Sequence, residues 1–163
     1  MNLTNLAKCI ENNNIEEAKK IISEIGRKKY FEAVPTLIKY LDNTNNSNLR
    51  NNIALALSDI GSTEAVIPLI NLIKNPKTIG NRGTLLYALT PFDYSMHFEF
   101  LVDLLKEDNF EVSRQSLSLI EDISKKIPAR IKQQCVIKIK KDIQFLEGKI
   151  DFLSEALNAL MEE

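Results

Sequence analysis

Apolar residues recur along this chain in paired stripes, with the spacing of three and four residues that is typical of α-helices. The clearest pair of stripes comprises Val34, Leu37, Ile38 and Leu41, followed by Leu49, Ile53, Ala56, Leu57 and Ile60. The polar segment 42–48 between them predicts a turn whose later residues cap the second helix. Gly61 predicts a left-handed helix end, and Ser62 a cap for the next helix. The pattern therefore predicts two antiparallel helices over residues 33–61.

The same pattern repeats. Residues 33–41 resemble residues 65–73 at an offset of 32, and this offset also relates Arg50 to Arg82 and Ala56 to Ala88. A third copy covers residues 97–124, and a looser copy, closed by Gly26, covers residues 3–26. Pro91 lies inside the second helix of its unit, and we expect it to bend that helix or end it early. Two-helix units of this kind bury their apolar stripes against their neighbours, which predicts stacking.

Two further apolar stripes follow, with Gly148 between them, and they predict a final helix pair over residues 128–162. We therefore predict one domain over residues 1–163, with repeats at about 3–26, 33–61, 65–93, 97–124 and 128–162. The expected fold is an all-α, right-handed α-solenoid of about five antiparallel helix pairs.

The repeat unit resembles the short HEAT-like repeats of the phycobilin-lyase type. The matching residues are Ala33 to Leu41 in the first helix, and Leu49, Arg50, Ile53, Ala56, Leu57, Ile60 and Gly61 in the second. The resemblance implies a scaffold architecture. It also implies that the second helices of successive units line the concave face, where a partner would bind. Without support from any other residue pattern, it further implies a lyase or chaperone for a bilin-type chromophore.

The amino-acid composition excludes few classes of function. The chain has 163 residues, a formal net charge of -1 and no tryptophan, so neither bulk charge nor a stacking indole points to nucleic acid. Cys9 and Cys135 lie in apolar stripes and predict buried, reduced thiols. There is no basic segment before a long apolar run at the N-terminus, and no stretch suited to a membrane span. We expect a cytoplasmic protein without a membrane partner.

Catalytic patterns are missing as well. The single histidine, His97, has no second ligand at metal-binding spacing, and the sequence contains no glycine-rich phosphate loop. We expect no enzyme activity, no cofactor and no metal. The aromatic segment 92–100 predicts core filling around Pro91, with Tyr94 as a surface anchor being the alternative.

Equivalent positions on successive second helices predict a binding surface. We expect a partner to contact side chains that point away from the core of these helices, because Tyr and Arg are enriched where binding energy concentrates. The candidate residues are Arg50, Asn51, Leu55, Arg82, Tyr87, Arg114, Ser118 and Glu121. For the arginines the alternative is a structural one, in which they brace the preceding unit and contact no partner.

The leading hypothesis is a monomeric, non-catalytic scaffold or adaptor that binds another protein, as an inhibitor or immunity-type protein would. The alternative is a nucleic-acid-binding protein that uses Arg50, Arg82, Arg114 and the basic stretch 125–141. Residues 125–145 contain seven Lys and Arg against one Asp, whereas residues 81–124 contain three against eight Asp and Glu. A basic segment of this kind predicts either a solvated helix face or a patch for an acidic partner.

Overall fold

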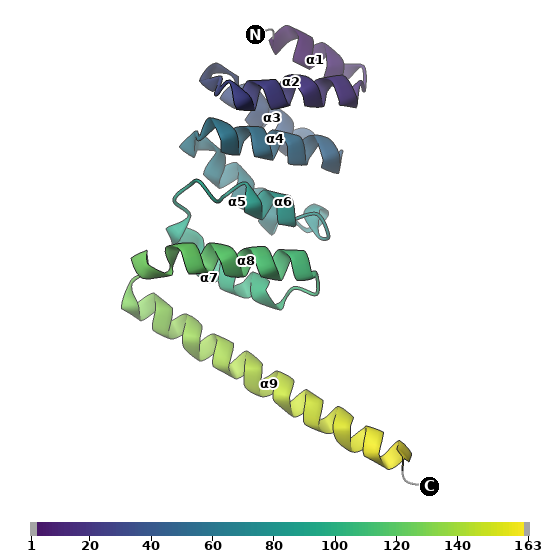
Figure 1. The fold of residues 1–163 in the computed structure, drawn as a ribbon, viewed down its shortest axis with the longest axis vertical. Coiled ribbons are helices and arrows are strands. Elements are labelled where there is room, and N and C mark those ends of the chain that lie inside the picture. The colour runs from purple at the N-terminus through teal and green to yellow at the C-terminus, as the bar shows by residue number, and fades with distance from the viewer. Residues whose placement is uncertain (1–2, 162–163) are drawn as a thin grey trace.

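The chain folds as a stack of helix pairs with a long helix at its C-terminal end. The computed structural model describes residues 3–161, which contain nine α-helices joined by turns and short 3₁₀ segments, and no strand. In Figure 1, α2, α4, α6 and α8 lie in one layer, with α1, α3, α5 and α7 behind them. This arrangement confirms the predicted α-solenoid. The helices are α1 (Leu3–Glu11), α2 (Ile15–Arg27), α3 (Val34–Asn43), α4 (Ser47–Ile60), α5 (Val66–Lys74), α6 (Gly83–Tyr87), α7 (Phe98–Asp103), α8 (Phe110–Ile123) and α9 (Ala129–Met161).

Asparagine side chains start three of the four second helices. Asn14, Asn46 and Asn109 are the N-caps of α2, α4 and α8, and each side-chain oxygen accepts a hydrogen bond from a backbone N–H of the first turn. Such caps satisfy donors that a helix start leaves unpaired. Gly61 ends α4 with φ 78°, as predicted. The prediction for Ser62 is wrong in part, since it precedes a 3₁₀ turn but its side chain makes no capping hydrogen bond.

Gly26 has a different role from the predicted one. Helix α2 continues past it to Arg27, and the residue with positive φ is Lys29, at 49°. Gly26 is buried against α4, where a β-carbon would lie 2.9 Å from the Cα of Ala56. The glycine is therefore needed for close helix packing and not for the chain reversal.

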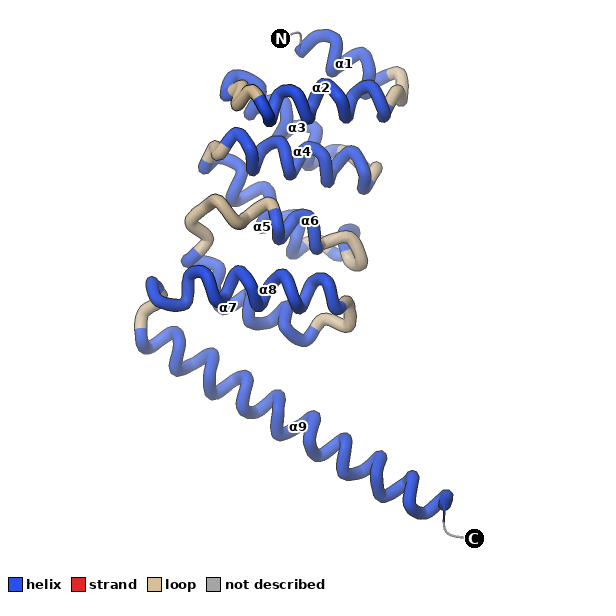
Figure 2. Tube along the Cα trace, viewed as in Figure 1, coloured by secondary structure: helices blue, strands red, loops and turns tan. Residues whose placement is uncertain are grey.

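The repeat over residues 65–93, which is the third in chain order, is irregular. Its second helix, α6, has only five residues, and a loop replaces the first turns of the helix found in the other repeats (Figure 2). Pro91 follows α6, which agrees with the predicted early end. Tyr94 is 1% exposed, and its hydroxyl donates a hydrogen bond to the carbonyl oxygen of Leu119 at 3.1 Å. Core filling is thus confirmed for this segment, and the alternative of Tyr94 as a surface anchor is wrong.

The predicted final helix pair is wrong. Residues 129–161 form one continuous helix, α9, which passes through Gly148 without a break; residue 162 lies outside the described residues. A glycine inside a helix costs only about 1 kcal/mol, which does not reverse a chain unless packing favours a turn there. The first part of α9 packs on α7, and its last part extends away from the stack (Figure 1). The solenoid therefore consists of four helix pairs and this single helix.

A search for a membrane-spanning segment among residues 3–161 finds no helix that is both long and apolar enough. The length of α9 does not make it one, because charged residues interrupt it throughout.

Candidate functional site

The second helices present a common outer surface, which we call the second-helix face. Each inner helix of this layer is enclosed on three sides: α6, for example, packs against α4, α5 and α8. Side chains of α6 that remain exposed must therefore point outward from the layer. Tyr87 is the largest of them, and 57% of it is exposed.

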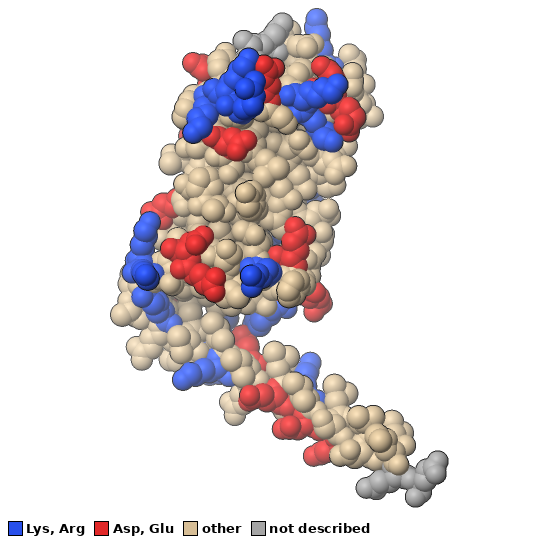
Figure 3. Space-filling view, in the orientation of Figure 1, with Lys and Arg blue, Asp and Glu red and all other residues tan. Residues whose placement is uncertain are grey.

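The middle of the second-helix face is nearly free of charge. Figure 3 shows Lys, Arg, Asp and Glu gathered near α2 and again near α8, with a mostly uncharged region over α4 and α6 between them. We call this region the central band, and we define it by the outward residues of α4 and α6. The uncharged ones combine amide, hydroxyl, aliphatic and aromatic groups: Asn48, Asn52, Leu55, Ser58, Thr84 and Tyr87. Asp59, near the end of α4, is the exposed charged residue of these two helices.

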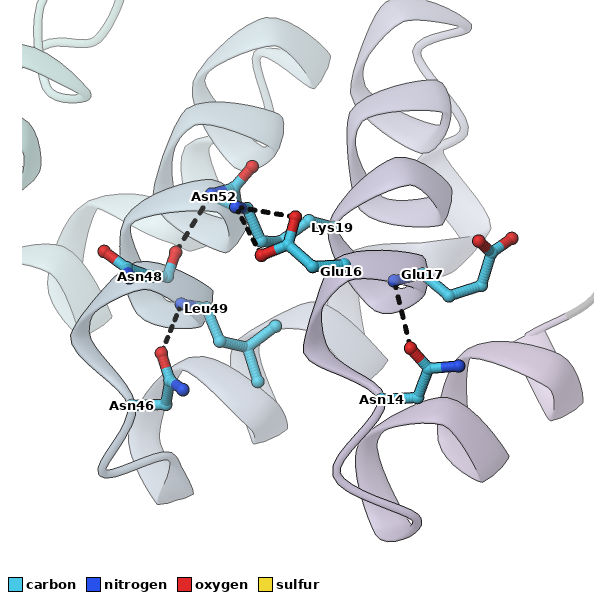
Figure 4. A network of polar contacts seen from close by, with 8 residues as sticks. All are labelled: Asn14, Glu16, Glu17, Lys19, Asn46, Asn48, Leu49 and Asn52. Carbon is cyan, nitrogen blue, oxygen red and sulfur yellow. Dashed lines mark hydrogen bonds and ion pairs between the residues drawn. The ribbon is translucent and has the colours of Figure 1, made fainter.

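The α2 end of the face is charged but internally compensated. Lys19 pairs with Glu16 at 3.1 Å and Lys28 with Glu24 at 2.6 Å, and the Lys28 ammonium group lowers the pKa of the Glu24 carboxyl. In Figure 4, Lys19 and Glu16 lie beside Asn52 of α4. A shallow surface hollow of about 530 Å³ lies here along α2, with Asn52 of α4 as its lining residue from the neighbouring helix. Its lining residues are Glu16, Lys19, Lys20, Ser23, Glu24, Arg27 and Asn52.

Two predicted binding residues are structural instead. Arg50 and Arg82 are only 3% and 6% exposed. Arg50 donates a hydrogen bond to the Thr44 carbonyl at 3.1 Å, which ties the start of α4 to the end of α3. Arg82 pairs with Glu107 at 2.5 Å and so links the third repeat to the fourth. The prediction that these side chains offer a binding surface is corrected accordingly. Arg82 braces the following unit, whereas the alternative named the preceding one.

Burial of these two charged side chains has an energetic cost. Burial lowers the pKa of the Arg50 guanidinium, although an arginine still carries its charge at neutral pH. The Nε atoms of Arg50 and Arg82 are buried and have no hydrogen-bond partner among the described residues. The same is true of Oδ1 of Asn51. Buried polar atoms of this kind cost stability when they stay unpaired. Arg50 and Arg82, near the starts of α4 and α6, therefore belong to the interior of the fold.

The other predicted site residues stay at the surface. Leu55 is half-buried on α4, Tyr87 is exposed on α6, and Arg114, Ser118 and Glu121 are exposed on α8. The layered arrangement brings Leu55, Tyr87 and Ser118 onto neighbouring helices of one face (Figure 1). Sequence reasoning did not identify Asn52, whose side-chain amide donates to the Asn48 carbonyl at 3.0 Å. The abundance of asparagine in 43–52 was the available signal.

The basic stretch 125–141 runs from the end of α8 into α9, away from the central band. Part of its charge is already compensated: Lys138 pairs with Asp103 of α7, and the Asp103 carboxylate raises the pKa of that lysine. Next to it, Lys106 pairs with Asp142 at 3.0 Å. These two ion pairs attach the first half of α9 to α7 and to the 3₁₀ segment Leu104–Lys106 that follows it. The stretch is therefore a docking element of the fold as well as a basic surface.

Groups with catalytic chemistry are not brought together. Burial and, secondarily, Lys74 lower the pKa of the His97 imidazole, and burial raises the pKa of the Cys135 thiol. Both cysteines are buried and unbonded. Within residues 3–161, no group of three or more His, Cys, Asp or Glu side chains is placed to hold a metal ion.

The stack of antiparallel helix pairs places this chain in the class of helical repeat proteins. The HEAT repeat family matches residues 3–90, which is more than half of the chain, and the protein belongs to that family. The match includes the loosest of the predicted repeats, 3–26. No curated protein and no solved structure matches the chain. The finer resemblance to phycobilin-lyase repeats stays a prediction. HEAT repeats generally form non-catalytic scaffolds and commonly mediate protein–protein interactions.

Proposed function

We propose that this protein is a non-catalytic scaffold that binds another protein on its second-helix face. The observation that carries the proposal is the central band, a mostly uncharged region over α4 and α6 between two charged regions (Figure 3). Its residues include the exposed Tyr87 and the half-buried Leu55. Protein interfaces share this composition: the core is poor in charge and contains aromatic anchors, and the rim is polar and charged. A partner covering the band would have its own contact surface blocked, which fits an adaptor, inhibitor or immunity-type protein.

The electrostatics favour a partner of mixed or neutral surface charge. At the α2 end, positive and negative side chains neutralise one another within the same helix. Such exposed pairs contribute little to affinity but suppress partners with a strong field of one sign. We therefore expect Tyr87 to carry most of the binding energy, with the ion pairs of α2 setting orientation.

The test compares two variants matched in exposure. Tyr87→Ala removes a side chain that is 57% exposed on α6, and Ile67→Ala removes one that is 56% exposed on α5, in the other layer. The full chain and both variants are immobilised, and proteins retained from the native cell are quantified by mass spectrometry. We expect at least one protein to be retained by the full chain and by Ile67→Ala, and to bind Tyr87→Ala at least about tenfold less. If Tyr87→Ala retains the same proteins as Ile67→Ala, the proposal is wrong.

Nucleic-acid binding is the second candidate, and the exposed cations of the basic stretch favour it. Arg50 and Arg82 are buried and drop out of this alternative, while Arg114 and the stretch 125–141 remain at the surface. Binding through phosphates would weaken steeply as salt rises. A mobility-shift titration with mixed DNA and RNA at about 50 mM salt tests it, since a protein that neutralises several phosphates must bind there. The absence of a shift would remove this candidate.

A further inference from the structure

The last part of α9 carries an apolar stripe that the rest of the described chain leaves uncovered. Every residue from Ile143 to Met161 is exposed. The aliphatic side chains of this stripe are between 48% and 85% exposed, although burial is their normal state in a folded protein. The stripe comprises Ile143, Leu146, Ile150, Leu153, Leu157 and Leu160.

The spacing of the stripe is that of a coiled coil. Its residues follow one another at intervals of three, four, three, four and three, which places them at the a and d positions of three consecutive heptads. The a positions are taken by Ile143, Ile150 and Leu157, so two of the three are isoleucine. All three d positions are leucine, at Leu146, Leu153 and Leu160. Isoleucine at a with leucine at d favours a parallel pair of helices, because the two side-chain shapes fit the two kinds of layer in such a pair.

The helix also needs a partner for its own stability. Beyond Asp142 every described residue of α9 is exposed, and this part of the helix contains Gly148, which costs about 1 kcal/mol relative to alanine in a helix interior. In proteins most of the stability of a helix comes from packing its apolar face, and little comes from the intrinsic helix propensity of its residues. The contact of Lys149 with the Phe145 ring, at 4.7 Å, is a local stabilisation of modest size. Burial of the stripe against another helix supplies the missing free energy.

We propose that residues 143–161 pair with the same segment of a second copy of this chain as a parallel, two-stranded coiled coil. Each of the six side chains exposes roughly 100 Å² of apolar surface. Two copies would thus bury on the order of 1,200 Å², the lower end of the range for stable protein interfaces. The proposal departs from the sequence-based expectation of a monomer. The predicted final helix pair would have given this stripe a partner helix in its own chain. With α9 continuous, the stripe lacks that partner within the described chain.

Charge argues against a membrane surface as the occupant. Residues 143–161 carry Glu147, Asp151 and Glu155 against a single cation, Lys149. Interfacial helices that bind anionic lipid are instead rich in Lys and Arg on their polar face. The parallel pair places Glu147 of one copy near Asp142 of the other, and Asp142 is already neutralised by Lys106 of its own chain. A substitution at Glu147 can therefore test whether the two helices are parallel.

The experiment measures the mass of the full chain in solution by sedimentation equilibrium between about 1 and 100 µM. We expect a concentration-dependent rise from 18.5 kDa to twice that mass. The double variant Leu146→Glu/Leu153→Glu should stay at the monomer mass with its solenoid intact by circular dichroism and thermal unfolding. Gln144→Glu/Asn158→Glu adds the same charge at outward b positions of α9 and should still dimerise. A single-chain mass for the unsubstituted protein at every concentration overturns the proposal, and so does a dimer that survives Leu146→Glu/Leu153→Glu.

Orientation has its own readout. In a parallel pair, residue 153 meets itself, so Leu153→Cys should give a disulfide-linked dimer under mild oxidation, while the buried Cys9 and Cys135 do not react. Glu147→Lys should strengthen the parallel pair because it then faces the partner's Asp142. A dimer that neither crosslinks through position 153 nor tightens with Glu147→Lys overturns the parallel arrangement. Binding of the full chain to phosphatidylserine vesicles as a monomer would overturn self-association as the role of this stripe.

Discussion

Gly26 of α2 lies directly against Ala56 of α4, since a β-carbon on Gly26 would lie 2.9 Å from the Cα of Ala56 and 3.1 Å from its Cβ. Both neighbours belong to a helix backbone or sit directly on it, so neither can move aside as a flexible side chain would. The small size of these two residues sets how closely the first repeat stacks on the second.

Gly26→Ala should lower the free energy of unfolding by about 1–3 kcal/mol, because the added methyl group overpacks the contact with Ala56. Urea denaturation of the full chain measures the change. The matched control is Gly148→Ala, where a β-carbon meets nothing within 4 Å. There the same substitution should favour the helix by up to about 1 kcal/mol. Equal effects of the two substitutions would contradict the close contact.

Glu107→Gln should destabilise the fold by about 1–3 kcal/mol, because it leaves the buried guanidinium of Arg82 without its charged partner. The junction between the third and fourth repeats depends on this pair. Thermal unfolding at low and moderate salt measures the loss, and little salt dependence is expected for a largely buried pair. Arg114→Gln changes an exposed arginine on α8 and should stay within about 0.5 kcal/mol of the unsubstituted chain.

Tyr94→Phe should cost about 0.5–1.5 kcal/mol at neutral pH through the lost hydrogen bond to Leu119. Burial, followed by the charges of Asp122 and Asp93, raises the pKa of the Tyr94 phenol to about 12. Because the folded-state pKa lies above the value of about 10 for an unfolded chain, Tyr94 stabilises the fold fully below pH 10. That contribution is lost as the pH rises from about 10 to 12.

The free energy of unfolding should therefore fall less steeply above pH 10 in Tyr94→Phe than in the unsubstituted chain. Parallel urea titrations at pH 8 and pH 11 measure the difference. Tyr87→Phe serves as the control, since Tyr87 is exposed on α6 and its substitution should leave the alkaline profile unchanged. Identical profiles for Tyr94→Phe and the unsubstituted chain would show that the phenol is not shielded.

Asn46→Ala should lower the free energy of unfolding by about 1 kcal/mol, because the Asn46 side chain caps α4 through a hydrogen bond from Leu49 N at 3.0 Å. The neighbouring exposed Asn45→Ala serves as the control and should change little. Hydrogen exchange of the first-turn amides of α4 gives a local readout. Faster exchange at Leu49 in Asn46→Ala alone would confirm the cap.

Much of the fold followed from short-range patterns, and the exceptions share a cause. The paired stripes, the left-handed Gly61 and the early end at Pro91 depend on neighbouring residues, so the sequence predicts them. The burial of Arg50 and Arg82 depends on a carbonyl at Thr44 and a carboxylate at Glu107, which only the folded chain brings within reach. The positions of Arg50 and Arg82 within their own helices do not reveal those contacts.

The sequence by itself determined that this protein is a stack of helix pairs, because an apolar stripe of helical period must be buried against a similar neighbour. Tertiary structure alone decided what the two interrupting glycines do. Gly26 packs against Ala56, whereas Gly148 stays inside a straight helix. Glycine permits a turn but does not impose one, so its outcome depends on which packing partners lie within reach.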